Sequence, residues 1–417
     1  MGPFSLNSEA ESSMATTAPW LTIIGIGEDG RAGLSPAALA ALDRAEFVIG
    51  GARHLALAVP LSARTQTWPS PFAEGYPMIL ARRGQPTCVL ATGDPFHYGV
   101  GAELARLVPV DEILCFSQPS AFSLAAARVG WSLPDCDCVS LHGRALERIV
   151  PLLQPGARIL ALSWDGSTPG KLAHLLTARG FGASTMTVLE AMGGPRERIR
   201  HVAANDLAIA DIDPLNTIAI EIAAASDSRI VTLAPGLPDS FFENDGQLTK
   251  AEIRALTLSA LAPKAGELLW DIGLGAGSIG IEWCLRHPRN RCIGIEERTE
   301  RADRARRNAQ DLGATALDIR IGRAPEALCD LPAPDAIFIG GGASEAGVFE
   351  AAWAALKSGG RLVINAVTLE TETLLGVLYA RHGGTMRRLA VSRLEPVGGM
   401  HGWRAAMPVT QWVVTKP

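Results

Sequence analysis

The sequence predicts an α/β protein of two domains. Short apolar runs alternate with segments of helical periodicity, the pattern of largely parallel sheets covered by helices. The chain has 417 residues, more than one ordinary core accommodates. At Leu268–Trp283 an apolar run leads into glycines at alternate positions and then into a helix-compatible segment. This order of strand, tight turn and helix is typical of a nucleotide site.

Composition excludes several classes of protein. The apolar fraction of 47% and the charged fraction of 19% are typical of a packed globular chain. The net charge of -5 argues against nucleic acid as a partner, and no apolar run reaches the roughly 18 residues that cross a membrane. Seven cysteines without a CxxC pair favour the cytoplasm, and no metal-ligand spacing is present. Residues 1–19 are expected to form a mobile polar tail without the features of a targeting peptide.

The first domain is expected over residues 20–225. Apolar runs that stop at glycine, proline or polar residues predict its strands at 20–26, 46–49, 87–91, 112–116, 158–162, 184–190 and 217–222. Helical periodicity predicts helices at 37–45, 100–107, 120–129 and 168–179. Ser35 before Pro36, and Ser120 after Pro119, are expected N-caps.

Three loops of this domain follow strands or open a helix: Gly25 to Gly27, Gly93-Asp94-Pro95, and Pro119-Ser120. Taken singly, each has an ordinary structural interpretation as a turn, a helix start or an N-cap. Ligands of parallel sheets bind at the carboxyl ends of strands, so the three loops together predict a ligand site.

The order of the motifs in this half resembles the tetrapyrrole (precorrin and cobalt-precorrin) C-methyltransferases, in particular the branch acting at C5 of precorrin-6B. The motifs are IGIGEDGRAGLS, GGARHL, ATGDPFHYGVG, QPSAFSLAAARVGW, SLHGR and EAMGGPRERI. The resemblance implies a dimeric two-lobed α/β fold with S-adenosyl-L-methionine between the lobes. It assigns Gly25 and Gly27 to the first cleft loop, Gly93, Asp94 and Pro95 to the cofactor loop, and Ser120 and Ala121 to the methionine part.

A linker is expected at 226–245, followed by a second domain at 246–417. Thr249 and Glu252 have capping-box spacing ahead of a helix. Beyond the opening strand, further strands are predicted at 291–295, 319–321, 336–339, 361–365, 387–394 and 410–415, and a helix at 299–312. The arginines of that helix, at 301, 304, 306 and 307, are expected on a solvated face.

The glycine turn of the second domain leaves two ligands open. Gly275, Gly277 and Gly280 satisfy GxGxxG, which is compatible with a nicotinamide dinucleotide. Glu296 lies about 20 residues past the glycines, where a carboxylate can accept both ribose hydroxyls. Two features count against the dinucleotide: Asp271 precedes a GxGxG run, as a single nucleoside needs fewer phosphate-binding donors, and no obvious hydride-transfer acid or base follows in the sequence.

This half resembles the decarboxylating precorrin methyltransferase domain that acts at C15, a Rossmann-like fold. The motifs are LPDSFF, LTKAEIRALTLSAL, LLWDIGLGAGSIGIEW, IGIEE, GRAPEAL, PDAIFIGGG and RLVINAVTLET. The resemblance implies that Thr249, Gly273 to Gly277, Glu296 and Ala324 contact S-adenosylmethionine, with Asp271 beside them. It also places Gly340 to Gly342 and Asn365 at the tetrapyrrole.

Together the halves resemble the bifunctional C5,15-methyltransferases of cobalamin biosynthesis. The implied reaction methylates precorrin-6B at C5 and C15 and removes the ring C acetate carboxyl, giving precorrin-8. A homo-oligomer is expected. Catalytic residues are not assigned; the candidates are Asp29 (or its neighbour Glu28), His142 and Asn365. Candidates for the substrate carboxylates are Arg53, His142, Arg144, Arg196, Arg393 and His401. A reductase using a nicotinamide cofactor and a chain with one half serving only as a scaffold are the alternatives.

Overall fold

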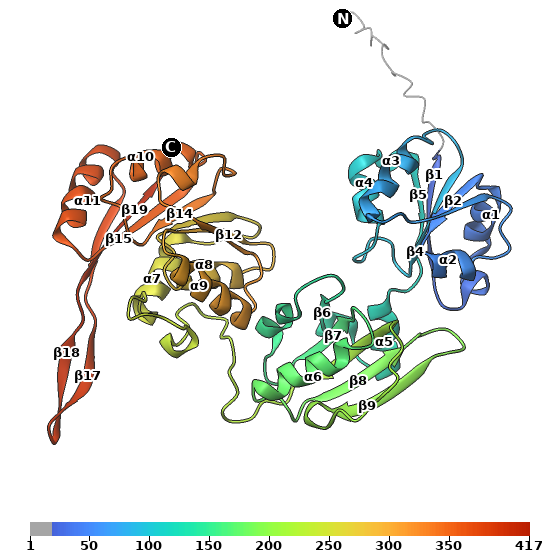
Figure 1. Cartoon of the computed structure of the whole chain (residues 1–417), viewed down its shortest axis with the longest axis horizontal. Helices are drawn as coiled ribbons and strands as arrows, with labels where there is room; N and C mark the ends of the chain where they lie inside the picture. Colours follow the sequence, from blue (N-terminus) through green and yellow to red (C-terminus); the bar gives the residue numbers. More distant parts are fainter. Residues whose placement is uncertain (1–18) are drawn as a thin grey trace, which may run out of the picture. The chain divides into compact units, whose positions relative to one another are not determined.

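The computed structural model describes residues 19–417, which form two compact units (Figure 1). The tail expected at 1–19 lies outside the described residues except for its last position. Unit 1 takes residues 19–143 and 156–226, and unit 2 takes Arg144–Pro155 and Asp227–Pro417. The chain therefore crosses between the units three times. The α/β fold class predicted from the sequence is confirmed.

The first sheet of unit 1 has the order β3-β2-β4-β1-β5, and all neighbouring strands are parallel. Its strands are β1 Leu21–Ile26, β2 Phe47–Gly50, β3 Arg64–Thr67, β4 Thr87–Thr92 and β5 Ile113–Phe116. The helices of this lobe are α1 Pro36–Arg44, α2 Ala52–Leu57, α3 Gly75–Leu80 and α4 Gly101–Leu107. The predicted Ser35 cap is confirmed, since its side chain accepts the Ala38 N–H at 3.2 Å. The carboxyl ends of these parallel strands meet at one edge of the sheet.

The second sheet of unit 1 has the order β6-β7-β10-β8-β9. Its elements are β6 Asp137–Ser140, β7 Arg158–Leu162, β8 Thr185–Glu190, β9 Arg198–Ala203 and β10 Asn216–Glu221, with α5 Ala121–Val129 and α6 Thr168–Ala178. Only β6 and β7 run parallel, so the expectation of a largely parallel sheet is wrong here. The reason is that β10 lies between β7 and β8 and runs antiparallel to both. The charged edge strand β9, which was not predicted, adds a further antiparallel pair with β8.

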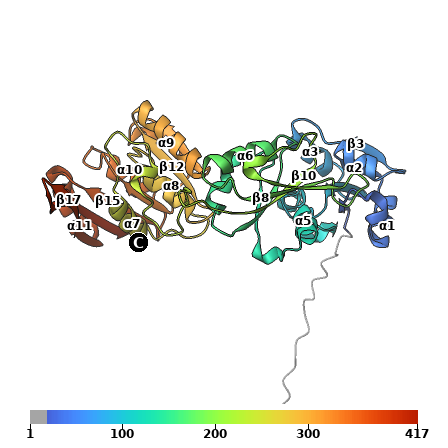
Figure 2. The same cartoon turned by 90° about the horizontal axis from the view of Figure 1, so that it is seen from below.

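Unit 2 is built on one sheet of order β13-β12-β11-β14-β15-β19-β16. The first five strands pair in parallel, and β19 pairs antiparallel with both β15 and β16. The strands are β11 Leu268–Ile272, β12 Arg291–Glu296, β13 Leu317–Ile321, β14 Ala336–Ile339, β15 Arg361–Ala366, β16 Thr385–Leu389 and β19 Val409–Thr415. The helices are α7 Ala251–Leu261, α8 Ser278–Leu285, α9 Thr299–Leu312, α10 Val348–Ala355 and α11 Leu369–His382. Figure 2 shows α8 and α9 close to β12, so one face of the sheet is covered beside the glycine turn.

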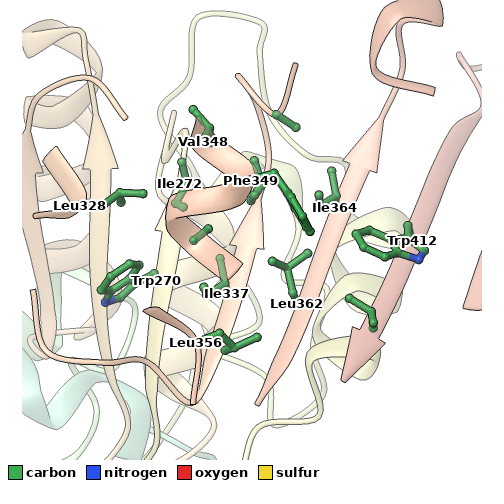
Figure 3. Packing of buried hydrophobic residues seen from close by; sticks show 14 of the residues in the cluster. Trp270, Ile272, Leu328, Ile337, Val348, Phe349, Leu356, Leu362, Ile364 and Trp412 are labelled. Carbon is green, nitrogen blue, oxygen red and sulfur yellow. The ribbon is translucent and has the colours of Figure 1, made fainter. Parts of the chain in front are cut away.

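The core of unit 2 fixes this arrangement. Trp270, Ile337 and Ile364 from neighbouring strands pack with Phe349 of α10 and with Trp412 of β19 (Figure 3). Trp270 and Trp412 are among the largest fully buried side chains. Removing this apolar area from water orders the strands whose ends carry the polar residues described below.

A separate two-stranded ribbon, β17 Ser392–Val397 and β18 Met400–Ala405, extends from unit 2 (Figure 1). The single strand predicted at 387–394 is therefore wrong: β16 ends at Leu389 and the ribbon begins three residues later. Leu394 lies opposite Trp403 and Pro396 opposite His401, so these four side chains share one face. The Trp403 side chain is 75% exposed. The ribbon is thus amphipathic, with its apolar face uncovered.

Short 3₁₀ helices complete the structure: η1 Gly30–Gly33, η2 Phe72–Glu74, η3 Val110–Glu112, η4 Leu133–Asp135, η5 Leu146–Leu152, η6 Ala204–Asp206, η7 Asp239–Phe241 and η8 Glu326–Leu328. Of these, η5 belongs to the stretch of unit 2 that interrupts unit 1 in the sequence. There Gln310 of α9 donates to the Glu147 carboxylate at 2.8 Å.

One local expectation for unit 2 is wrong. The capping box at Thr249 and Glu252 does not form, because α7 begins at Ala251 with Lys250 as N-cap and Glu252 pairs instead with Arg393. The arginines of α9 are exposed or partly exposed, as expected, but they also form ion pairs. Arg301 bonds Asp245 and Arg307 bonds Glu243, so they hold the segment before α7 against α9.

Candidate functional site

The three glycine and proline loops of unit 1 converge through their backbones. A Cβ added to Gly25 would lie 1.7 Å from the Gly93 carbonyl oxygen, and one added to Gly93 would lie 2.8 Å from the Pro119 oxygen. Gln118 N–H also donates to Gly93 at 3.0 Å. Only residues without Cβ allow this approach. The structure therefore brings together the predicted loops at 25–27, 93–95 and 119–121.

The helix that opens from these loops is capped as predicted. The Ser120 hydroxyl accepts the Ser123 N–H at 3.2 Å, and Ala121 is the first residue of α5. In the neighbouring loop, the Asp94 carboxylate accepts the Phe96 N–H at 2.9 Å. The Asp94 and Ser120 side chains therefore stabilise their own loops.

A chain of ion pairs lies beside this site. The Glu28 carboxylate, with only 8% of its side chain exposed, pairs with Arg53 and, at 3.2 Å, with Arg196. Arg196 also pairs with Asp213. Glu28 and Arg53 come from the first lobe of unit 1, and Arg196 and Asp213 from the second. The two lobes are thus linked by charged side chains, two of which were candidates for substrate carboxylates.

His54 and Thr92 extend this polar group. The His54 Nε2 atom lies 2.7 Å from the Thr92 hydroxyl, and Thr92 directly precedes the loop at 93–95. Burial, with a smaller effect of the Arg53 charge, lowers the pKa of His54 to about 4. The imidazole is therefore neutral at physiological pH and serves as a hydrogen-bonding group.

The candidate Asp29 is exposed and lies beside the first of the converging loops. A Cβ added to Gly27 would be 2.7 Å from its carboxylate oxygen, and the same carboxylate lies where a Cβ on Gly33 would be. His142 is exposed and lies 6.3 Å, between ring centroids, from the exposed Trp164. Both remain candidates.

Unit 2 contains a cavity of about 850 Å³, within the range of small-molecule sites. It lies at the carboxyl ends of β11, β12, β14 and β15 and is also lined by residues 246–250 and by the base of the ribbon. The predicted residues that line it are Thr249, Asp271, Gly273 to Ala276, Glu296, Ala324, Gly340 to Gly342, Asn365 and Arg393. Gly277 is not among the lining residues. Its added Cβ would lie 3.1 Å from Ala305 Cβ, so it permits close packing of α8 on α9.

The glycine turn is held by carboxylates on both sides. Asp271 accepts the Gly280 N–H at 2.9 Å, and Glu296 accepts the Gly275 N–H at 2.8 Å. Gly273, Gly275 and Gly277 all have positive φ. Because L-residues with a side chain rarely adopt that conformation, the turn requires glycine.

Asp271 is the most strongly perturbed acid of the site. Burial raises the pKa of its carboxyl to about 7; the nearby Glu296 charge adds to the rise, and the bond from Gly280 opposes it. Its Oδ1 atom is buried and makes no hydrogen bond within residues 19–417. An unsatisfied buried oxygen that lines a cavity is available to a donor group on a ligand.

Asn365 is fixed from behind. It donates to the Thr257 hydroxyl at 2.9 Å and accepts from Gln411 at 3.0 Å. Sequence analysis missed Thr257 and Gln411, which lie on α7 and β19, far from Asn365 in the sequence. It also missed the pair between Arg323 and Glu345 at the cavity rim. The GRAPEAL motif contains Arg323 but did not indicate its partner.

Comparisons with known proteins match both halves of the chain. A family model described as tetrapyrrole (corrin/porphyrin) methylases matches residues 20–208, and one described as a precorrin methyltransferase domain matches residues 240–416. A precorrin-6Y C(5,15)-methyltransferase (decarboxylating) from Sinorhizobium sp is 53% identical over 408 residues, covering 98% of this chain and 99% of the relative. The chain belongs to the precorrin C(5,15)-methyltransferase (decarboxylating) family.

Other members of this family are also similar. The protein of the same name from Mycobacterium tuberculosis (strain CDC 1551 / Oshkosh) is 40% identical over 400 residues, 95% of this chain and 100% of the relative. A crystal structure of the C-terminal domain of precorrin-6Y C5,15-methyltransferase from Rhodobacter capsulatus is 49% identical, covers 45% of this chain and all of that chain, and has a TM-score of 0.43.

Membership in a methyltransferase family implies a methyl donor. The residues of the unit 2 cavity fit a nucleoside-type donor. Its glycine turn lets the backbone approach a ligand closely. Glu296 offers carboxylate oxygens, and the unbonded Asp271 oxygen can accept a hydrogen bond from a ligand. Among residues 19–417, no group of His, Cys, Asp and Glu could hold a metal ion. In the same range, no helix is both long and apolar enough to cross a bilayer.

Proposed function

We propose that the chain methylates precorrin-6Y at C5 and C15 and removes the carboxyl of the ring C acetate, giving precorrin-8 in cobalamin biosynthesis. The substrate name is the form carried by the relatives. The observation that carries the proposal is the relative that is 53% identical across both units. The presence of two separate polar sites, one in each unit, supports two methylations.

S-adenosyl-L-methionine is the proposed donor at both sites, where it supplies a methyl group on a sulfonium. In unit 1 the loops at 25–27, 93–95 and 119–121 would hold it. In unit 2 the turn at Gly273 to Gly277, with Thr249, Asp271, Glu296 and Ala324, would do so. The lining of the unit 2 cavity supports this assignment except at Gly277, whose role there is packing.

The proposed reaction mainly requires that the protein align the methyl donor with the tetrapyrrole and exclude water. Enamine-like carbons of the tetrapyrrole are nucleophiles, and its conjugated ring can accept the electrons released by decarboxylation. Arg53 and Arg196 in unit 1, and Arg393 in unit 2, are the proposed contacts for substrate carboxylates. All three already pair with protein carboxylates, so they bind oxygen anions in this structure.

A homo-oligomer and a cytoplasmic location are part of the proposal. An isolated two-stranded ribbon is marginally stable in water, and the apolar face carrying Leu394 and Trp403 is exposed. A like ribbon from a second copy would cover it. All seven cysteines are free, which suits a reducing compartment.

The test is incubation of the full chain with precorrin-6Y and S-adenosylmethionine, with and without NADPH, and with product masses as the readout. Gain of two methyl groups and loss of one CO₂ is expected. Reduction of the tetrapyrrole by NADPH without methyl transfer would overturn the proposal in favour of a reductase. One methyl group only would indicate that one unit is a scaffold.

A further inference from the structure

Residues 243–250, called the strap here, include one wall of the unit 2 cavity. Gly246 to Lys250 line the cavity directly. The strap is held from behind by α9. Arg301 bonds Asp245 at 2.8 Å and Gln247 at 2.7 Å, and Arg307 forms a bidentate pair with Glu243. These charged contacts are partly exposed and individually weak.

Asn308, also on α9, makes a different kind of contact. Its side chain is only 4% exposed. Its oxygen accepts the Glu243 N–H at 2.8 Å, and its amide nitrogen donates to the Glu243 carbonyl at 2.9 Å. The same nitrogen donates to the Ala276 carbonyl at 2.9 Å. One buried amide therefore binds both the first residue of the strap and the glycine turn.

The neighbouring residue contacts on α9 reinforce this geometry. Ala305, one turn before Asn308, is the residue that Gly277 packs against. Helix α9 thus contacts the glycine turn at Gly277 and at Ala276, and the strap at Glu243. A single helix therefore positions two segments that line the same cavity.

We propose that Asn308 is a positioning residue for the methyl donor of unit 2, setting the spacing between the glycine turn and the strap. It touches neither donor nor tetrapyrrole. The inference rests on the proposed function only in taking S-adenosylmethionine as the ligand. Losing the amide frees the two walls independently, so donor affinity at this site falls while unit 1 is unaffected.

Asn290 provides a matched control in the same unit. It is 1% exposed, accepts the Gly266 N–H at 2.8 Å and donates to the Trp283 carbonyl at 3.4 Å. It therefore also bridges two backbone segments, but neither Gly266 nor Trp283 lines the cavity, whereas Ala276, which Asn308 binds, does. Asn290→Ala reports the cost of losing a buried bridging amide without any change to a cavity wall.

The experiment is calorimetric titration of the full chain with S-adenosylhomocysteine, together with melting temperatures. The wild type is expected to show two sites. Asn308→Ala should keep one and weaken the other about tenfold, equivalent to about 1.4 kcal/mol, while Asn290→Ala keeps both. Asn308→Ser, whose hydroxyl cannot span both walls, is the milder variant should alanine prevent folding.

In turnover, Asn308→Ala should raise KM for S-adenosylmethionine in C15 methylation and leave C5 methylation unchanged. Equal affinities in the Asn308 and Asn290 variants at similar melting temperatures would overturn the inference alone. A wild-type chain that lacks a donor site in unit 2 would overturn the proposed function as well.

Discussion

The Arg254 guanidinium meets the Glu282 carboxylate at 2.5 Å inside unit 2, and neither side chain has any exposure. Glu282 also accepts the Gly236 and Leu237 N–H groups at 2.7 and 2.9 Å. Arg254 donates to the Leu237 and Thr249 carbonyls. A fully bonded buried pair thus ties the approach to α7, including the cavity residue Thr249, to helix α8.

Arg254→Met should destabilise unit 2 by about 3–5 kcal/mol, because it leaves the Glu282 charge buried without its partner. Chemical denaturation followed by fluorescence checks this. The control is Arg306→Ala, which breaks an exposed pair with Asp303 and should cost about 1 kcal/mol or less. Equal effects of the two substitutions would contradict the role of burial.

Asp271 should make folding stability depend on pH. Because the folded-state pKa of Asp271, about 7, lies above the ordinary value of 3.8 for an Asp carboxyl, the folded state retains a proton that the unfolded state loses between these values. This contribution is complete below about pH 4 and is lost as pH rises to about 7. Asp271→Asn does not titrate, so its stability relative to wild type should rise by about 4 kcal/mol over that interval. Denaturation at several pH values, with the exposed Asp303→Asn as control, measures it; parallel curves would refute the prediction.

Gly25→Ala should abolish C5 methylation, since its Cβ would overlap the Gly93 carbonyl oxygen. C15 methylation and CO₂ release should continue, which mass analysis of the products would show. Gly170→Ala, on a helix of unit 1 with its nearest contact at 3.8 Å, is the control and should retain both methylations. Full C5 methylation by the Gly25 variant would exclude this loop from the site.

Glu296→Gln should raise KM for S-adenosylmethionine in C15 methylation by about tenfold, as expected for loss of a charge-assisted hydrogen bond of roughly 1.4 kcal/mol. The adjacent Glu297→Gln is the control; Glu297 lines the cavity but is exposed. Initial rates of C15 methylation at varied donor concentration give the comparison. A change in kcat alone would argue against a role in donor binding.

Trp403→Ser should reduce the molar mass of the assembly in light scattering, because it removes the largest apolar group from the exposed face of the ribbon. Trp164→Ser, which changes another exposed tryptophan, should leave the mass unchanged. A monomeric wild-type chain would contradict assembly through the ribbon.

Local sequence predicted much of the fold because strand, turn and helix signals lie within a few residues of each other. The turn after Asp271 and the caps at Ser35 and Ser120 are of this kind. The sequence did not predict the hairpin β8–β9 because its edge strand, β9, is polar. In the structure the arginines at 198 and 200 of this strand pair with the buried Glu190.

In the candidate sites too, local features could be predicted from the sequence and contacts between distant residues could not. Glycines that require positive φ or close approach can be recognised from spacing. Contacts between distant residues cannot: Glu28 and Arg196 are 168 residues apart, and nothing near either one indicates the other. The ribbon has strand-like sequence, but its exposed apolar face depends on which sheet it joins, which local pattern does not specify.

The segment Arg144–Pro155 has a consequence for synthesis of the chain. It belongs to unit 2, yet it is made before β7 to β10 of unit 1. Its partner surface lies at the end of α9, where a Cβ on Gly313 would be 2.5 Å from the Glu147 oxygen. That part of the chain leaves the ribosome more than a hundred residues later. During synthesis, unit 1 can therefore form both of its sheets while Arg144–Pro155 still lacks its partner surface. Unit 2 can fold completely only after the last part of the chain has been made. A cut at Ser226 would divide unit 2 rather than separate the two units.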